Sequence, residues 1–304
     1  MHITDLTIAS FRNLKDLVLK DLGQVNLLVG ENDSGKTSAL EAIALYCQPL
    51  RLQRWIDTAK HRNALQQLDS QDIQWLFPKG DRDILIASPD RALQASRSGH
   101  EIQVTIEKLV AYHSTKTTTV LRDGNPPIAD ASHEIPVRFA SSPLCINHEF
   151  DISKSDIVSL LQKLDPDISD IEIPQANAVY LRHKSLGLAP ISVFGKGINQ
   201  LFRLAVQIEQ AKDGLLLIDE IDLGIHNDAL ASFFWLVNWD KQFNVQIFAT
   251  THSLEAIDSM IDATSSDAEL VLFRLEPIEG KTRIVRHGWE RLKRLREDLG
   301  QDVR

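Results

Sequence analysis

The order of apolar and polar positions along this chain predicts alternating strands and helices from the first residues onward. Residues 3–9 alternate between apolar and polar, and a turn-like segment at 11–14 separates them from the apolar residues 17–19. Residues 25–29 form an apolar, strand-like run, and apolar side chains then recur at helical spacing over 39–44. Alternation is typical of a half-buried strand, and an apolar run of a strand buried on both faces. We therefore expect two strands beside a buried strand that leads into a helix.

The middle of the chain, residues 50–190, reads as an inserted helical and β region. Its expected elements are a mostly helical stretch at 50–77, short strands at 102–110, 117–121, 137–139, 144–146 and 178–181, and a helix at 155–164. Alternating strands joined by a loop rich in Gly and Pro are typical of an antiparallel sheet. The region carries no catalytic signature.

Buried strands and helices alternate again after residue 190. The expected elements are a helix at 198–208, a strand at 215–218, a helix at 227–241, a strand at 245–249, a helix at 254–260, a hairpin of 270–275 with 282–285, and a helix at 289–299. Short, wholly apolar strands of this kind are typical of a parallel sheet that helices cover on both faces.

The composition limits the number of domains, the class of protein and the cellular compartment. A chain of 304 residues forms one large domain or two small ones, and its 43% hydrophobic and 25% charged residues are ordinary for a globular protein. The sequence has no apolar run of the roughly 18 residues that a membrane span needs, and Met1 to Asp5 lack the character of a signal peptide. Cys47 and Cys145 stand far apart. We therefore expect a cytoplasmic protein without a membrane partner.

The strand at 25–29 runs directly into the pattern G-x-x-x-x-G-K-[ST], which is matched at every fixed position. Its residues are Gly30, Glu31, Asn32, Asp33, Ser34, Gly35, Lys36 and Thr37, and Ser38 follows. Glycines let backbone N–H groups converge on an anion at the start of a helix, where the helix dipole also favours negative charge. The motif predicts a phosphate-binding loop in which Lys36 reaches the β- and γ-phosphates of ATP and Thr37 ligates Mg²⁺. The alternative is a glycine-rich turn that happens to carry a lysine.

Two further strand ends carry candidate chemistry. The apolar strand at 215–218 ends in Asp219 and Glu220, the pattern of a Walker B motif, in which Asp219 would ligate Mg²⁺ and Glu220 would deprotonate the attacking water. The strand at 245–249 ends in Thr250, Thr251 and His252. Polar residues at the carboxyl end of such strands line the ligand crevice of α/β sheets. His252 alone could also be a capping or core residue.

Weaker candidates are Arg12, the glycines of the Phe194 to Gly197 turn, and two basic stretches. Arg12 could contact a bound nucleotide or be solvated, and Gly195 and Gly197 open a helix as the P-loop does. Residues 50–77 combine basic and aromatic side chains, and the helix at 289–299 is basic. A nucleic-acid or partner surface and an ordinary solvated face, with buried tryptophans in the first stretch, are the alternatives.

Taken together, these motifs resemble the ABC-type ATPases of the RecF, SMC and OLD group, above all the single-chain AAA-like ATPases related to the OLD ATPase domain. The resemblance covers nearly the whole chain and is most specific at 3–45 and 214–257. It implies an α/β P-loop NTPase of the ABC-ATPase head type, with a mainly parallel sheet, an antiparallel β lobe and an inserted helical region. Residues 1–304 would be a single ATPase domain with 50–190 inserted in it.

The same resemblance implies a head-to-tail homodimer with ATP sandwiched between two subunits. His252 would contact the γ-phosphate, residues 222–226 would be the D-loop that touches the opposite subunit, and the Gly195 to Gly197 turn would take the place of the signature motif. Phe194 and Gly195 stand where the wider ABC group has a serine followed by glycines. The sequence has neither an SMC-type heptad arm nor a Toprim nuclease domain, so nuclease activity would belong to another chain.

We therefore expect an ATP-hydrolysing switch for a separately encoded effector, a nuclease or toxin, in DNA repair or anti-phage defence. The alternatives are the nucleotide-binding subunit of an ABC transporter and a non-hydrolysing scaffold. The net charge of −9 predicts that DNA binding by the chain alone is weak.

Overall fold

The computed structural model describes eleven stretches of the chain. These are residues 2–60, 70–80, 82–99, 101–110, 113–122, 134–141, 154–175, 178–222, 244–264, 270–278 and 281–304. Among these residues, no helix is both long and apolar enough to cross a lipid bilayer.

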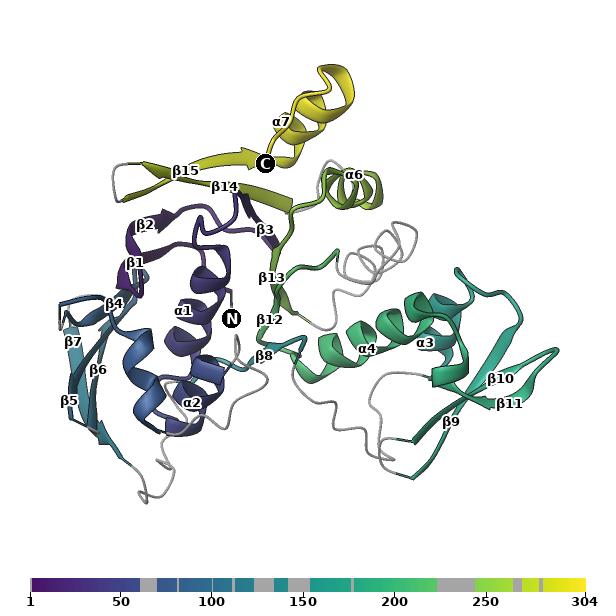
Figure 1. Ribbon diagram of the computed structural model, residues 1–304, viewed down its shortest axis with the longest axis horizontal. Coiled ribbons are helices and arrows are strands. Elements are labelled where there is room, and N and C mark those ends of the chain that lie inside the picture. The colour runs from purple at the N-terminus through teal and green to yellow at the C-terminus, as the bar shows by residue number, and fades with distance from the viewer. Residues whose placement is uncertain are drawn as a thin grey trace.

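A mainly parallel sheet of six strands forms the centre of the molecule (Figure 1). In spatial order its strands are β15 (Lys281–Gly288), β14 (Leu270–Ile278), β3 (Val25–Gly30), β13 (Gln246–Thr250), β12 (Leu215–Ile218) and β8 (Val137–Phe139). All neighbouring pairs are parallel except β14 with β15. Every residue of β3, β12 and β13 is buried, as the apolar runs predict for strands covered on both faces.

A second sheet of six strands is wholly antiparallel and stands beside the first (Figure 1). Its order is β2 (Leu14–Leu19), β1 (Leu6–Phe11), β4 (Ile84–Ala87), β5 (Arg91–Ser98), β6 (Glu101–Val110) and β7 (His113–Leu121). We expected β1 and β2 beside β3, but they pair with each other and with β4, and β3 pairs with β13 and β14. Because β1 and β2 have one buried face, they fit a sheet that covers a helix from one side, and the doubly buried β3 fits the middle of the other sheet.

Helix α1 (Lys36–Cys47) lies between the two sheets, and nearly all of its residues are buried. One core cluster joins α1 to the inner faces of both sheets, with Leu40, Ile86 and Phe273 among its members. The other face of the parallel sheet packs against α4 (Lys196–Gln210) and α6 (Leu254–Ala263) in a second cluster. The P-loop helix is thus held on both sides, which fixes where its first turn points.

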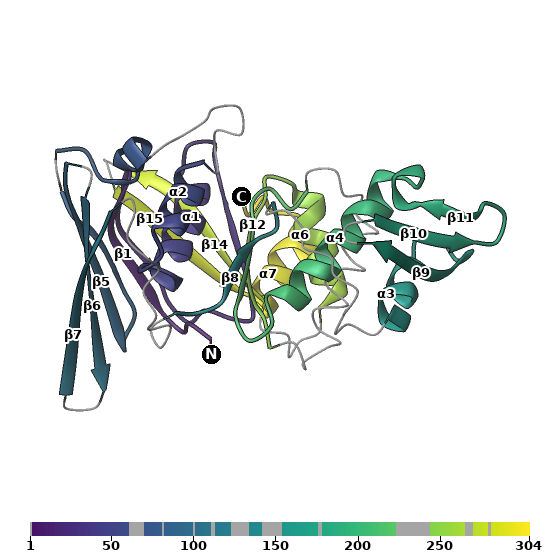
Figure 2. The ribbon, with the colours of Figure 1, turned by 90° about the horizontal axis from the view of Figure 1, so that it is seen from below.

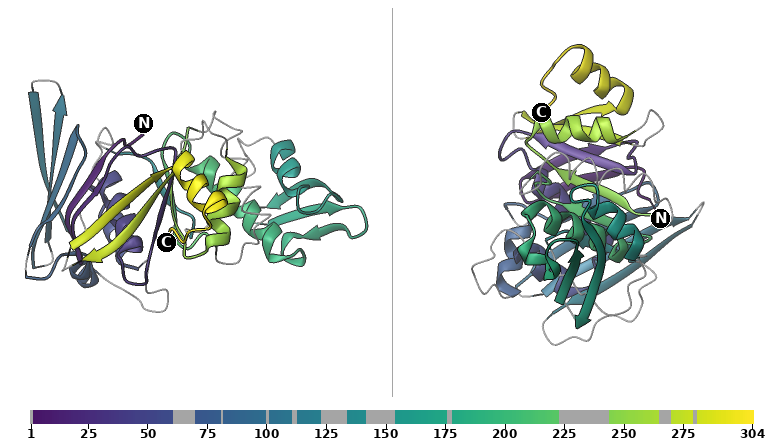
Figure 3. Two further views of the ribbon diagram at one scale, coloured as in Figure 1. Left: turned by 90° about the horizontal axis from the view of Figure 1, so that it is seen from above. Right: turned by 90° about the vertical axis from the view of Figure 1, so that its right-hand side faces the viewer.

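Residues 50–190, which we predicted to be an insertion, lie mostly at the two ends of the molecule, although β8 of this stretch is an edge strand of the parallel sheet. The first part of the stretch supplies α2 (Leu52–Lys60), the 3₁₀-helix η1 (Ser70–Leu76) and strands β4 to β7. The second part supplies α3 (Lys154–Leu161) and a small sheet of β9 (Ile168–Gln175), β10 (Ala178–His183) and β11 (Gly187–Pro190), which η3 (Ile191–Val193) joins to α4. Figures 2 and 3 show the antiparallel sheet and this small sheet at opposite ends.

Most predicted elements are present, with a few differences. Strands β4, β5, β9 and β11 were not expected from the sequence, and the basic helix at 289–299 is α7 (Trp289–Lys293) followed by a π-helix, η5 (Arg294–Asp298). Trp55 is buried, as predicted, and donates a hydrogen bond to the Pro49 carbonyl, but Trp75 is 68% exposed. The predicted strand at 144–146, the helix at 227–241 and Cys145 lie outside the described residues.

Candidate nucleotide site

The P-loop backbone has a shape that only glycine allows at both ends of the loop. Gly30 has φ of 144° and Gly35 has φ of 99°. A Cβ atom on Gly30 would lie 2.5 Å from the Leu275 carbonyl oxygen, and one on Gly35 would lie 2.4 Å from Cδ2 of Leu14. Strand β14 and the β1–β2 turn therefore press against the loop, and the two glycines permit this close approach.

Lys36 points back into the loop that precedes it. Its Nζ atom donates to the carbonyl oxygens of Gly30 at 2.9 Å and of Glu31 at 2.8 Å, and the side chain is buried. Burial lowers the pKa of Lys36, while the nearby carboxylates of Asp219, Glu220 and Asp33 oppose the shift. A buried ammonium group of this kind is strongly attracted to an anion that enters the loop, since few water molecules compete for it.

Thr37 meets Asp219 at the start of α1. The Thr37 hydroxyl donates to Oδ1 of Asp219 at 3.2 Å, and the Thr250 hydroxyl donates to the same oxygen at 2.6 Å. Thr250 Oγ1 also accepts a hydrogen bond from the Glu220 backbone N–H at 2.7 Å. Hydroxyl and carboxylate oxygens side by side are the donor set that Mg²⁺ prefers, so Thr37 and Asp219 fit a magnesium ion. Thr250 orients both acidic residues from the neighbouring strand.

Glu220 has φ of 50°, a left-handed conformation that is uncommon for a residue with a side chain. Its carboxylate is exposed in the cavity beside Asp219 and has no hydrogen-bond partner that fixes it among the described residues. The adjoining Thr250 carbonyl accepts a hydrogen bond from the Ile221 N–H at 2.9 Å, which anchors the chain directly after Glu220. An exposed carboxylate on an anchored turn can accept a proton from a water molecule.

His252 stands in the turn between β13 and α6. The Thr251 hydroxyl donates to Oδ1 of Asp222 at 2.5 Å, and the Ser253 hydroxyl caps α6 by accepting from the Ala256 N–H at 3.1 Å. The His252 carbonyl accepts a hydrogen bond from Arg304 at 3.0 Å. Since its neighbours are tied to other elements, His252 has a fixed place at the edge of the site.

These residues share one cavity of about 790 Å³. Of the residues expected from the sequence, it is lined by Asn32, Asp33, Ser34, Gly35, Lys36, Thr37, Ser38, Asp219, Glu220 and His252. Gly30 and Glu31 line a smaller cavity of about 370 Å³ next to it, which also includes Asn32 and His252. The volume of the larger cavity suits a nucleotide-sized ligand.

Thr250 also lines the large cavity, as expected for a polar residue at the end of a buried strand, although the sequence gave it no individual role. Five residues of the large cavity were missed by sequence reasoning. They are Asn13, Leu14, Pro277, Lys281 and Thr282. These residues come from the β1–β2 turn and the β14–β15 hairpin, and neither carries a motif that points to the P-loop.

Arg12 does not line this cavity. Its Nε atom lies 2.8 Å from Oε2 of Glu41, a fully buried carboxylate on α1, and its backbone N–H donates to the Leu76 carbonyl. The arginine therefore neutralises a charge under the P-loop helix.

Gly195 and Gly197 also lie away from the cavity. Gly195 has an ordinary φ of −57° as the N-cap of α4, and no atom in the described part of the chain lies within 4 Å of where its Cβ would be. Asn199 braces the turn by donating to the carbonyls of Ile191 at 2.9 Å and Phe194 at 3.1 Å. Of the expected D-loop, Asp222 is described and residues 223–226 lie outside the described part of the chain.

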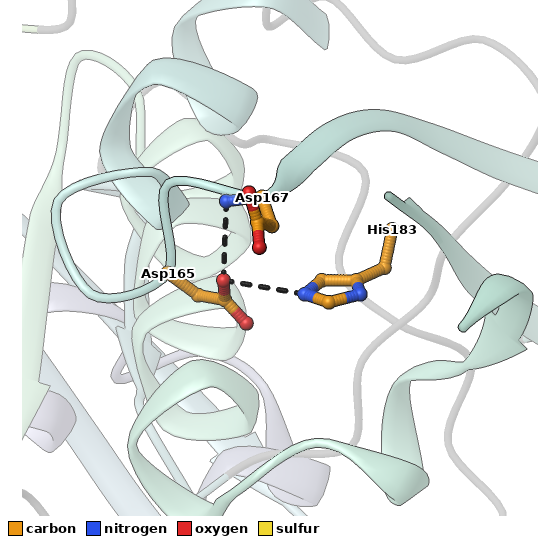
Figure 4. Close-up of side chains that lie close together, drawn as sticks. All are labelled: Asp165, Asp167 and His183. Carbon is orange, nitrogen blue, oxygen red and sulfur yellow. Dashed lines mark hydrogen bonds and ion pairs between the residues drawn. The ribbon is translucent and has the colours of Figure 1, made fainter. Parts of the chain in front are cut away.

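Asp165, Asp167 and His183 form a second cluster, in the small-sheet region (Figure 4). Nε2 of His183 lies 3.4 Å from Oδ1 of Asp165, and Nδ1 accepts the backbone N–H groups of Ser185 and Leu186 at 3.3 Å. Because Nδ1 accepts, the proton of a neutral ring is on Nε2, where it faces the carboxylate. The ring then offers no lone pair to a cation between the aspartates. The hydrogen bonds of His183 instead hold the β10–β11 turn in place.

The basic helix is partly neutralised by carboxylates of α6 and of its own next turn. Arg296 makes a bidentate pair with Asp258 of α6, and Lys293 lies 3.7 Å from Glu297 and over the Trp289 ring. Arg291 and Arg294 remain exposed. The local positive charge is therefore smaller than the sequence suggests.

Comparisons with known proteins match this chain to ATPase domains and to nucleotide-related proteins. A protein family described as "AAA ATPase domain" matches residues 1–88. An "ATP/GTP phosphatase" of Helicobacter pylori is 20% identical over 84% of this chain and 86% of its own length. A "DNA replication and repair protein RecF" of Nitrosococcus oceani is 50% identical over 66 residues, which are 22% of this chain and only 17% of that protein.

Solved structures share the fold at low sequence identity. The "SMC head domain from Thermotoga maritima" has a TM-score of 0.51 and 12% identity, covering 94% of this chain and 98% of that one. A structure titled "SmcHead bound to the C-winged helix domain of ScpA" has a TM-score of 0.57 and 14% identity, covering 95% and 99%. The chain thus has the ABC-ATPase head fold that was expected.

The longest family match spans most of the inserted region, the Gly195 turn and the Asp219–Glu220 pair. The matching family is described as "AAA domain, putative AbiEii toxin, Type IV TA system". Its match covers residues 78–258, which is more than half of the chain. The chain therefore belongs to this AAA-domain family.

Proposed function

We propose that this chain binds ATP with Mg²⁺, hydrolyses it, and uses the cycle as a switch for a separately encoded effector. The observation that carries the proposal is the convergence of Lys36, Thr37, Asp219 and Glu220 on one cavity, although Asp219 follows Thr37 by 182 positions along the chain. Phosphoryl transfer needs positioning and charge compensation more than covalent chemistry. Four side chains with these roles in one cavity supply both.

Each side chain has a distinct role in the proposed reaction. The loop N–H groups and Lys36 bind the β- and γ-phosphates, and Lys36 exchanges its carbonyl partners for phosphate oxygens. Thr37 and Asp219 would hold Mg²⁺, which when bound supplies positive charge to the phosphates. Glu220 accepts the proton of the attacking water, and His252 contacts the γ-phosphate from the edge of the site.

The proposal includes a homodimer that closes over two ATP molecules. Gly195 and its neighbours form an exposed helix start outside the chain's own nucleotide cavity, so the nucleotide that they would bind belongs to a second subunit. ATP would then favour the closed dimer by its higher affinity for that state.

The effector is proposed to be a nuclease or toxin in DNA repair or anti-phage defence. Similarity to RecF over 66 residues supports a connection with repair, and membership of a family described as a putative AbiEii toxin of a type IV TA system supports a role in a toxin system. We further propose that residues 1–304 are one ATPase domain with 50–190 inserted, related to the OLD ATPase domain. With a net charge of −9, the chain alone would bind DNA weakly, and a salt titration would show a steep loss of any binding.

The test separates binding from chemistry with two variants and two controls. Lys36→Ala should weaken ATP binding by about 100-fold or more, because a charged partner of the phosphates is lost. Glu220→Gln should bind ATP normally and turn over about 100- to 10,000-fold more slowly, because the general base is lost. The exposed Lys20→Ala and Glu290→Gln should match the wild type. Wild-type turnover by Glu220→Gln would refute its role as the base.

A further inference from the structure

The C-terminal segment, residues 299–304, returns to the nucleotide site along α6. Arg296 binds Asp258 of α6 through Nε at 2.7 Å and Nη2 at 2.8 Å, and its Nη1 donates to the Gln301 carbonyl at 2.6 Å. Val303 is only 2% exposed and belongs to the core cluster that contains the buried face of α6. The segment is therefore docked by an apolar side chain and by a network of charged hydrogen bonds.

Arg304 extends from this docked segment to the turn that carries His252. Its Nη1 atom donates to the backbone carbonyl oxygen of His252 at 3.0 Å. Its Nε and Nη2 atoms donate to the two carboxylate oxygens of Asp302 at 3.0 Å and 2.7 Å. A bidentate pair fixes the plane of a guanidinium group, so Asp302 aims the remaining nitrogen of Arg304 at His252.

Arg304 and Asp302 also line the small cavity beside the P-loop. That cavity includes Gly30, Glu31, Asn32 and His252, of which Asn32 and His252 also line the large nucleotide cavity. Arg304 therefore lies at the edge of the nucleotide site where His252 is held. Its side chain remains 41% exposed, so it is not part of a packed core.

We propose that Arg304 is a positioning residue of the nucleotide site, which acts by holding the backbone of His252. This inference rests on the proposed ATPase function and extends the site to the end of the described chain. The side chains of Thr251 and Ser253 are hydrogen-bonded to other groups, and among the described residues the His252 carbonyl accepts a hydrogen bond from Arg304 alone. The neighbours fix where His252 lies, and Arg304 fixes the orientation of its peptide plane. Without Arg304, the peptide between the two anchors can tilt, and the imidazole shifts with it.

The contact also couples the C-terminal segment to the nucleotide. If docking of residues 299–304 improves the geometry of His252 for ATP, then ATP must by the same amount stabilise the docking. The segment would be held more firmly in the ATP-bound state and released more easily after hydrolysis. A surface that changes with the nucleotide in this way is what a switch needs to signal to an effector.

The kinetic test uses the full chain and compares Arg304→Ala, Arg304→Lys and Arg294→Ala. Arg304→Ala should lower kcat by about tenfold with KM for ATP within about twofold of the wild type, because a small displacement of a group at the γ-phosphate affects the transition state more than binding. Arg304→Lys, which can still donate to the His252 carbonyl, should recover most of kcat. Arg294→Ala removes an exposed arginine of η5, the helix that precedes this segment, and should leave both constants unchanged.

Unchanged kcat in Arg304→Ala, or a loss that Arg304→Lys does not relieve, would overturn the inference. A second measurement tests the role of Arg304 independently of the proposed ATPase function. A non-hydrolysable ATP analogue should slow amide hydrogen exchange at 251–254 and 300–304 in the wild type, and at neither segment in Arg304→Ala. If the wild type fails to hydrolyse ATP, the proposed function fails, and the exchange result still decides the coupling. Equal exchange with and without the analogue overturns it.

Discussion

Two glycine turns open helices in this protein, and they differ in what surrounds them. The P-loop turn before α1 is enclosed, with Leu275 on one side of Gly30 and Leu14 on one side of Gly35. The turn before α4 is open, and no atom of the described residues lies within 4 Å of the missing Cβ of Gly195. The first has left-handed glycines and the second has an ordinary φ of −57°.

The difference indicates that the two turns meet their ligands in different ways. An enclosed loop with a buried lysine binds its anion with groups from its own subunit. An exposed helix start offers N–H groups and a favourable dipole, but its other contacts must come from a second molecule. The same device, a glycine turn at a helix start, would thus be used once for intramolecular binding and once for assembly.

The sharpest way to break this comparison is to add a methyl group to each turn. In Gly30→Ala the new Cβ meets a backbone oxygen at 2.5 Å with φ at 144°, which should cost about 3 kcal/mol of unfolding free energy and abolish ATP binding. Gly195→Ala meets nothing, so its unfolding free energy should stay within about 0.5 kcal/mol of the wild type. Denaturant melts and ATP titrations measure both. Equal losses in the two variants would contradict the contrast between the turns.

The next effect concerns assembly in the presence of ATP. Glu220→Gln should trap ATP and sediment as a dimer, and adding Gly195→Asp should return it to a monomer, because the new carboxylate would face the γ-phosphate of the second subunit. The Asp variant should still bind ATP, since Gly195 lies outside the cavity of its own chain. Glu220→Gln with Gly195→Ala is the control for the loss of glycine itself. A monomer under every condition would argue against the sandwich.

How much could be predicted from the sequence also differs between these regions. The P-loop strand and helix and the strands β12 and β13 were predicted because each combines a buried apolar run with a motif at a fixed spacing. The sequence also predicted that the residues after these strands lie close together, since parallel strands end at one edge of a sheet. Thr250 was not assigned a role, because its bonds to Asp219 and Glu220 depend on the register of β13 beside β12.

The inserted region was harder to predict, and the reason is physical. Strands β4 and β5 contain exposed apolar and buried charged positions, such as Leu85 at 41% exposure and the buried Arg91 over the Tyr46 ring. These positions weaken the alternation on which a strand prediction depends. The placing of β1 and β2 in the second sheet failed similarly, because periodicity gives the buried face of a strand but not its neighbours.

The smallest predicted effect concerns the hairpin that supports the P-loop turn. Leu275 of β14 pairs with Gly30, and Leu272 of the same strand pairs with His287 of β15. Burial lowers the pKa of His287 from the usual 6.5, and Arg291 and Arg274 add to the shift. As the pH falls below 6.5, the unfolded chain takes up this proton before the folded chain does, so the protein loses stability until the pH reaches the folded-state pKa.

The slope of that loss cannot exceed about 1.4 kcal/mol per pH unit for one group. His287→Gln should flatten the decline of unfolding free energy below pH 6.5, as measured by denaturant melts across a pH series. Because the hairpin supports the enclosed turn and not the open one, the same change should make ATP affinity less sensitive to acid. The protection of α4 amides against hydrogen exchange should change only as much as the unfolding free energy of the whole protein does. An unaltered pH profile in His287→Gln would show that the hairpin does not carry this dependence.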